Sequence, residues 1–178
     1  MGDVQRAMSA FSAGAEIMRT LVTFNEADTI RAHQSAERAF AGRVVFGGMT
    51  PPPAIFIVGM PRTGTTMTEQ LLLGDQRVGS IGETRAFLES SWPWLGTTDP
   101  ATAPSADLHA LFTKERLAIV QRNYAQRVRE YQLPADKTIL LDKTTPNYVW
   151  APLAASALAA RIVHCVRDPI DTCLSIYT

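Results

Sequence analysis

The segment Gly59–Thr66 holds residue types that bind phosphate groups in many proteins. It reads Gly-Met-Pro-Arg-Thr-Gly-Thr-Thr and directly follows the apolar run 54–58. Its two glycines have the spacing of the phosphate-binding loop G-x4-G-K-[ST], whose backbone N–H groups and following helix N-terminus surround an anion. We predict an anion site to which this loop contributes the ligands Arg62, Thr63, Gly64, Thr65 and Thr66.

The loop departs from that pattern at one position. Thr65 replaces the lysine that reaches the outer phosphates of a nucleoside triphosphate, and Arg62 lies inside the loop. An arginine stays charged at any working pH and binds two oxygens of an anion at once. The departure disfavours ordinary ATP or GTP hydrolysis, although a lysine-less P-loop kinase or NTPase stays an alternative. The other alternative is a strand-to-helix turn without a ligand.

A second candidate anion site begins at Arg167, directly after an apolar run. Asp168 can cap the helix that follows, and Pro169 suits its first turn. Arg167 then lies at a helix N-terminus, where anions are stabilised. Ser175, two turns later, is close enough to donate to the same phosphate. In the alternative interpretation Arg167 pairs with Asp171, and Ser175 faces a neighbouring helix.

Apolar runs bounded by turn residues predict the strands that position both motifs. These strands cover residues 54–58, 78–80, 138–141 and 162–166. Between them, helical patterns cover about 67–72, 105–132 and 151–160. Alternating strands and helices predict an α/β fold, with a P-loop-type parallel sheet flanked by helices and ligands bound at the carboxyl ends of the strands.

The first fifty residues have a helical pattern. Apolar residues recur at steps of three or four, which places them on one helix face: Val4, Met8, Phe11, Ala15, Met18 and Val22. Asp3 can cap this helix, and a second helix from Asn25 to about Phe40 ends before a stretch rich in Gly and Pro. We predict a helical segment over 1–50 that forms a hairpin and packs on a domain over 51–178.

In the long helix over 105–132 we expect apolar residues to face inward and basic residues to face solvent. The inward set is Leu108, Phe112, Leu117, Val120, Tyr124, Val128 and Tyr131. The solvated set is Lys114, Arg116, Arg122, Arg127 and Arg129. Elsewhere, Cys165 and Cys173 are expected to be buried, inert thiols.

The composition excludes several classes of function. Seventeen Lys and Arg residues balance 17 Asp and Glu residues, so the net charge is zero and we expect no nucleic-acid partner. No apolar run approaches the roughly 20 residues that cross a bilayer, and the N-terminus lacks a charged-then-apolar leader. Two cysteines are too few for a disulfide scaffold. We therefore expect a cytoplasmic protein with no metal and no membrane segment.

The loop over 57–66 resembles the 5′-phosphosulfate loop of the sulfotransferases that use 3′-phosphoadenosine 5′-phosphosulfate (PAPS). Its form Pro-Arg-Thr-Gly-Thr-Thr is similar to the tyrosylprotein sulfotransferase branch and its bacterial relatives, which often carry an N-terminal tetratricopeptide array. The segment 161–175 resembles the 3′-phosphate motif of that family, in which a strand-end Arg and a later Ser hold the phosphate. The resemblance covers about residues 54–178.

The resemblance implies a role for several residues. Arg167 and Ser175 bind the 3′-phosphate of PAPS, and the loop with Arg62 binds the phosphosulfate end. Glu83 is similar to the catalytic base of the tyrosylprotein branch, and we expect its side chain to be partly desolvated. Lys143 is similar to the lysine that supports developing charge on the transferred group. No metal is required when Arg62 and Lys143 supply the positive charge.

Other interpretations of these positions stay open. Glu83 is also explained as an exposed acidic residue at a helix N-terminus, and Lys143 as a surface lysine. The apolar run that ends at Asp142 has a Walker-B-like interpretation. Arg85 is similar to an arginine that helps to orient the family's site.

A histidine is the rival base, because the cytosolic sulfotransferases use one. His164 lies inside a predicted strand, and we expect it to be a satisfied core residue. His109 lies in the long helix and His33 in the N-terminal segment, and neither has a motif around it.

The implied function is transfer of a sulfuryl group from PAPS to an acceptor hydroxyl on a peptide, sugar or small molecule, with a tyrosine phenol as one candidate. A dimer is left open. The chain ends at Thr178 inside a predicted helix, so we expect a truncated, C-terminally incomplete domain, with an inactive remnant as the alternative. Acceptor choice is expected to depend on loops such as 90–106, where Trp92 and Trp94 either form a wall or simply pack.

Overall fold

Four parallel strands form the centre of the computed structural model, which describes residues 2–41, 53–91 and 112–177. The strands are β1 (Ala54–Gly59), β2 (Val78–Ser80), β3 (Ile139–Asp142) and β4 (Arg161–Cys165), in the spatial order β2-β3-β1-β4. In β1, Phe56 lies opposite Asp142 of β3 and Ile162 of β4. All four strands were predicted to within one residue at each end, and the predicted α/β fold with a parallel sheet flanked by helices is confirmed.

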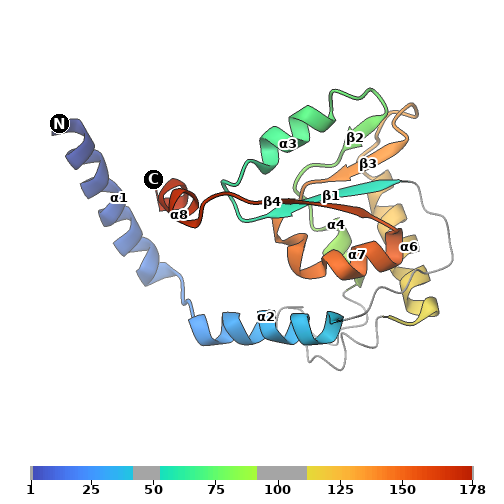
Figure 1. Ribbon diagram of the computed structural model, residues 1–178, viewed down its shortest axis with the longest axis horizontal. Coiled ribbons are helices and arrows are strands. Elements are labelled where there is room, and N and C mark those ends of the chain that lie inside the picture. The colour runs from blue at the N-terminus through green and yellow to red at the C-terminus, as the bar shows by residue number, and fades with distance from the viewer. Residues whose placement is uncertain (1, 42–52, 92–111, 178) are drawn as a thin grey trace.

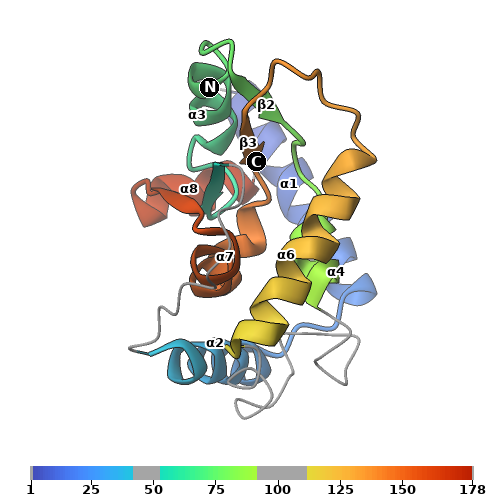
Figure 2. The same ribbon diagram turned by 90° about the vertical axis from the view of Figure 1, so that its right-hand side faces the viewer.

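Helices cover both faces of this sheet (Figures 1 and 2). One face carries α3 (Thr65–Leu72). The other face carries α4 (Ala86–Ser91), α6 (Lys114–Arg129) and α7 (Ala151–Leu158), with the 3-10 helix η3 (Thr145–Trp150) leading into α7. Helix α8 (Pro169–Tyr177) follows β4, and α1 (Gly2–Leu21) and α2 (Glu26–Phe40) precede the sheet.

The larger core lies between the sheet and α4, α6 and α7. Phe56 of β1 is fully buried there, against the rings of Phe87 and Tyr124. Because side chains alternate along a strand, Ile57 points to the opposite face and packs in a smaller cluster beneath α3. A strand buried on both faces explains why β1 is a continuous apolar run.

The two N-terminal helices, α1 and α2, differ in how much of their apolar surface is buried against the domain. Helix α2 packs on the domain through the buried Phe40, whose ring contacts Phe112 and Trp150. Helix α1 extends away from the domain (Figure 1), and Val4 and Leu21 of its apolar stripe are 70% and 72% exposed. The predicted packing of a hairpin is therefore wrong for α1, whose apolar stripe is exposed and whose Ser12 hydroxyl shares a 2.6 Å hydrogen bond with that of Tyr177 on α8.

Both helices begin near the predicted positions, but only α2 has a side-chain cap among the described contacts, and that cap was not predicted. Asn25 caps α2, and its side-chain oxygen accepts a hydrogen bond from the backbone N–H of Asp28. Asp3 does not cap α1, since that helix begins at Gly2 and Asp3 lies in its first turn.

Strand β4 is more open than predicted, because it forms one edge of the sheet and no described strand pairs with its outer side. His164 is exposed rather than a satisfied core residue. Cys165 is half-buried, and Cys173 on α8 is exposed, so neither is the fully buried thiol that we predicted.

Helix α6 confirms most of the predicted inward face, with Phe112 just before it and Leu117, Val120 and Tyr124 buried. Tyr131 is an exception, because α6 ends at Arg129 and Tyr131 is 42% exposed. Arg127 is not simply solvated, since its guanidinium lies 2.8 Å from a carboxylate oxygen of Glu89. Leu108, His109, Trp92, Trp94 and the predicted helix over 105–111 lie outside the described residues.

The backbone of Gly59, at the end of β1, lies very close to that of Cys165 at the end of β4. Its φ angle is +146°, a conformation that side-chain-bearing residues rarely adopt. A Cβ atom at this position would lie 2.5 Å from the backbone carbonyl oxygen of Cys165. Glycine is therefore needed where the sheet passes into the loop 60–64.

We expect Gly59→Ala to lower the free energy of unfolding by about 2 kcal/mol or more, because it combines backbone strain with a backbone clash. Urea denaturation followed by circular dichroism measures this. Gly14→Ala is the control, since nothing lies within 4 Å of the added Cβ in α1. An unfolding midpoint for Gly59→Ala equal to that of Gly14→Ala would contradict the expectation.

Candidate functional site

The loop between β1 and α3 has the backbone shape of an anion-binding turn. Gly64 is the N-cap of α3 with φ +92°, and Arg62 also has a positive φ of +69°. The Thr63 hydroxyl donates to the carbonyl oxygen of Met60 at 2.7 Å, and this hydrogen bond within the loop stabilises the turn. Positive φ angles next to a helix N-terminus direct successive backbone N–H groups toward one side, where an anion is stabilised.

The two predicted anion motifs meet at this loop. The Arg62 Nε atom donates to the Ser175 hydroxyl oxygen at 3.0 Å, although 113 positions separate the two residues. Arg167 donates from Nη1 to the backbone carbonyl oxygen of Arg62 at 3.3 Å. Two guanidinium groups and a hydroxyl therefore gather beside the loop, which gives the site positive charge and several donors.

The alternative interpretation of Arg167 is present at the same time. A second nitrogen of its guanidinium lies 3.8 Å from a carboxylate oxygen of Asp171. Asp168 caps α8 as predicted, because its side chain accepts from the backbone N–H groups of Ile170 and Asp171. This cap fixes the start of α8, directly after Arg167.

Glu83 and Lys143 form a second group at the carboxyl ends of β2 and β3. The Lys143 ammonium donates to a carboxylate oxygen of Glu83 at 2.7 Å. Lys143 is 7% exposed, so the interpretation as a surface lysine is wrong. The Glu83 side chain is 63% exposed, so the expected partial desolvation is also wrong, because the turn after β2 carries it on the open edge of the sheet. Arg85 lies 3.8 Å from Glu89, on α4.

The structure adds Glu69 and Ser80 to this group, and the sequence analysis missed both. One carboxylate oxygen of Glu69 accepts from the Ser80 hydroxyl at 2.5 Å, and the other lies 3.6 Å from the Lys143 ammonium. Glu69 is buried on α3, four positions after the buried Thr65. An acidic residue on the inward face of a short helix was the signal that could have revealed it.

The charges around Lys143 favour its ammonium form. Its hydrogen bond with Glu83 raises the pKa of Lys143 above the usual range, although burial opposes the shift and the charge of Glu69 adds to it. The group therefore presents a permanently charged lysine beside an exposed carboxylate.

Asp142 lies directly before Lys143 but points into the protein. It is fully buried and accepts hydrogen bonds from the Tyr124 hydroxyl and from the backbone N–H of Thr144. The Asn147 amide lies 3.4 Å from the same carboxylate. Burial raises the pKa of Asp142 to about 6 despite these donors. A carboxylate held in this way is a structural group, which argues against the Walker-B-like interpretation.

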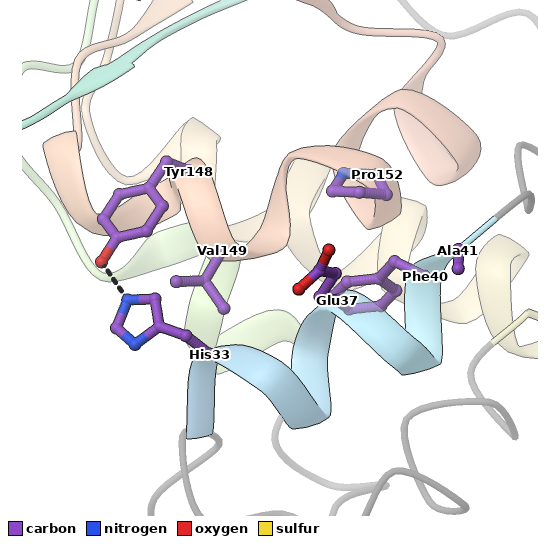
Figure 3. Close-up of a pocket in the computed structure, with 7 residues that line it drawn as sticks. All are labelled: His33, Glu37, Phe40, Ala41, Tyr148, Val149 and Pro152. Carbon is purple, nitrogen blue, oxygen red and sulfur yellow. Dashed lines mark hydrogen bonds between the residues drawn. The ribbon is translucent and has the colours of Figure 1, made fainter. Parts of the chain in front are cut away.

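A pocket of about 330 Å³ lies between α2 and the segment that joins η3 to α7 (Figure 3). His33 and Tyr148 share a 2.5 Å hydrogen bond at one end of it, and Phe40 lies further along its wall. His33 is thus engaged with Tyr148 and not with the loop or with Lys143. No group of three or more metal-ligating side chains occurs among the described residues, and no helix in that part of the chain could span a bilayer.

Comparison with known proteins identifies a family for the part of the chain that contains the sheet and the loop. A sequence model of the sulfotransferase family matches residues 53–178. The chain belongs to the sulfotransferase family. Over 130 residues it is 28% identical to an uncharacterized protein of Aquifex aeolicus (strain VF5), in an alignment that covers 69% of this chain and 16% of that protein. No solved structure gives a significant match.

Both groups of predicted residues lie inside the part of the chain that matches the sulfotransferase family. The phosphate loop, Glu83, Lys143, Arg167 and Ser175 all follow the start of the match at residue 53. Helices α1 and α2 precede it. The family assignment therefore concerns the α/β domain.

We expect the buried Asp142 to make stability depend on pH. Its pKa of about 6 lies above the ordinary value of 3.8, so the folded state binds a proton more tightly than the unfolded state. The stabilisation is complete below about pH 4 and is lost as pH rises to about 6, by up to about 3 kcal/mol. Asp142→Asn removes the titration, so urea unfolding of both proteins at pH 4 and 7 measures it. Equal pH dependence in the two proteins would contradict the prediction.

Proposed function

We propose that this chain is part of a PAPS-dependent sulfotransferase that transfers a sulfuryl group to an acceptor hydroxyl. The observation that carries the proposal is the contact of Arg62 with Ser175, together with that of Arg167 with the loop. A phosphate loop alone suits many nucleotides. A second set of phosphate ligands beside it suits a nucleotide that carries phosphate on both its 5′ and 3′ oxygens, as PAPS does.

In this proposal the loop and Arg62 bind the 5′-phosphosulfate, and Arg167 and Ser175 bind the 3′-phosphate. The backbone N–H groups of the loop and the N-terminus of α3 supply donors without adding charge. Arg62 lies between the two groups, because its Nε atom already contacts Ser175. Membership in a family that generally uses PAPS supports this choice of donor.

The transfer step assigns Glu83 as general base. Its carboxylate takes the proton of the acceptor hydroxyl while that oxygen attacks sulfur, and the bond between sulfur and the 5′-phosphate oxygen breaks. Lys143 and Arg62 stabilise the negative charge that develops on this leaving oxygen. The hydrogen bond from Lys143 orients the Glu83 carboxylate beside the site of transfer.

The acceptor reaches Glu83 from the open edge of the sheet. The 63% exposure of the Glu83 side chain supports an acceptor that is itself large, such as a peptide or a sugar. The sequence of the loop favours the tyrosylprotein branch, and we propose a tyrosine phenol as the acceptor to test first.

A lysine-less P-loop kinase or NTPase is the second candidate, because the glycine spacing of the loop favours a nucleotide phosphate. The Asp142 carboxylate that would serve such an enzyme is buried in hydrogen bonds. Magnesium-dependent ATP turnover would favour this candidate over sulfuryl transfer.

We expect adenosine 3′,5′-bisphosphate to bind more tightly than AMP, because only the former places a phosphate beside Arg167 and Ser175. Ser175→Ala should weaken bisphosphate binding about tenfold or more, the effect of losing a hydrogen bond to a charged group, and weaken AMP binding less, because AMP loses only the orientation that Ser175 gives to Arg62. Isothermal titration calorimetry measures both. Cys173→Ala is the control, since Cys173 is exposed on the same helix. Equal affinity of the wild-type chain for the two nucleotides would contradict the donor assignment.

We expect Glu83→Gln to lower kcat for transfer of labelled sulfate from PAPS to a tyrosine peptide about 100-fold or more, because it removes the base. Glu115→Gln, an exposed position in the first turn of α6, should keep full activity. If Glu83→Gln retained the wild-type kcat, another group would be the base. If the wild-type chain transferred sulfate to no phenol or sugar, the proposed activity itself would be wrong.

A further inference from the structure

We propose that Glu69 is a positioning residue that holds the Lys143 ammonium at the site of transfer. This inference rests on the proposed function, because it concerns the lysine that would stabilise the leaving oxygen. It adds a residue for which neither the sequence motifs nor the family assignment gave a role.

Glu69 connects three elements at the carboxyl edge of the sheet. It lies on α3, the helix that begins at the phosphate loop. One of its oxygens accepts from Ser80 at the end of β2, and the other lies 3.6 Å from Lys143 after β3. A single buried carboxylate therefore ties the helix behind the loop to the ends of both neighbouring strands.

The burial of Glu69 and Lys143 contrasts with the exposure of Glu83. Glu69 and Lys143 are 8% and 7% exposed, whereas the Glu83 side chain is 63% exposed. An exposed ion pair is weak and easily exchanged, whereas a buried one is fixed by its surroundings. Lys143 thus has one buried partner, Glu69, and one exposed partner, Glu83, whose carboxylate an acceptor can reach.

The difference between the two carboxylates matters when the acceptor hydroxyl gives up its proton. Once Glu83 accepts the proton of the acceptor hydroxyl, its carboxyl group is neutral and attracts Lys143 much less. Glu69 takes no part in this proton transfer, and its buried carboxylate still lies 3.6 Å from the ammonium and holds it in the same place. The charge of Lys143 is then available to the leaving phosphate oxygen at the moment it is needed.

Ser80 extends the effect of Glu69 to the base itself. Its hydroxyl donates to Glu69 and accepts from the backbone N–H of Gly82 at 2.9 Å. Gly82 has a φ of +67° and directly precedes Glu83. The same hydroxyl therefore orients the carboxylate behind Lys143 and the turn that carries Glu83.

The first test measures Lys143 without any transfer reaction. The chain has three lysines, Lys114, Lys137 and Lys143, so acylation at pH 8 followed by peptide mass spectrometry gives the reactivity of each. Glu69→Gln removes a negative charge 3.6 Å from the ammonium, which should increase the acylation rate of Lys143 about fivefold. The rates of Lys114 and Lys137 in the same sample are the internal controls. An unchanged Lys143 rate overturns the proposal.

The second test asks whether Glu69 acts through Lys143. We expect Glu69→Gln to lower kcat about 10- to 100-fold, as loss of an orienting partner usually does, and to leave the Kd for adenosine 3′,5′-bisphosphate within about twofold. In a Lys143→Met background the same change should lower kcat by less than about threefold. Additive losses, or a loss of bisphosphate affinity equal to the loss of kcat, overturn the proposal. Gln70→Ala, exposed on the same helix, is the matched control.

A second variant keeps the test decisive if Glu69→Gln does not fold. Glu69→Asp keeps the negative charge but shortens the side chain, which moves the carboxylate away from Ser80 and Lys143, so we expect a smaller fall in kcat that also disappears in the Lys143→Met background. The two proposals fail differently. A wild-type chain without transfer activity refutes the proposed function, whereas an active chain with additive losses refutes the role of Glu69 alone.

Discussion

Parallel pairing of β1 with β3 on one side and β4 on the other is the constraint on which the candidate site depends. It places the carboxyl ends of the strands on one edge, so the segments that follow each strand converge there. The close approach of Gly59 to Cys165 sets how near the loop comes to β4. Arg62 and Ser175, far apart in the sequence, can contact each other because of this arrangement.

The polar groups at this edge divide into two kinds. Around the loop, the side chains of Arg62 and Arg167 are exposed and Ser175 is half-buried, so solvent or a ligand can reach the guanidinium groups. Around Lys143, a buried carboxylate and a buried ammonium lie beside one exposed carboxylate. Asp142 contributes to neither group directly, but its hydrogen bonds with Tyr124 and Thr144 fix the chain immediately before and after Lys143. The rigid support of the group around Lys143 and the access to the group around the loop are therefore found at the same edge of the sheet.

The strands and the phosphate loop could be predicted because they depend on local pattern: apolar runs between turn residues, and two glycines at a fixed spacing. Burial was harder to predict, since it depends on which elements lie next to a residue. His164 is in a strand as predicted, yet it is exposed because β4 is an edge. Glu69 was missed because its role depends on contacts with Ser80 and Lys143, which lie 11 and 74 positions away in the sequence (80 − 69 and 143 − 69). The apolar stripe on α1 could be recognised in the sequence, but the pattern does not say which element packs against it, and in the structure Val4 and Leu21 are exposed.

The bond between Arg62 and Ser175 has a consequence for the thermodynamics of ligand capture. A long arginine side chain loses rotamer freedom when it becomes fixed, and an association that must impose this order is weakened accordingly. The Arg62 side chain is already restricted in the folded chain, because its Nε atom donates a hydrogen bond to the Ser175 hydroxyl on α8. An anion arriving at the glycine turn therefore meets a guanidinium that is preorganised, and a smaller share of its interaction energy is consumed in ordering the protein.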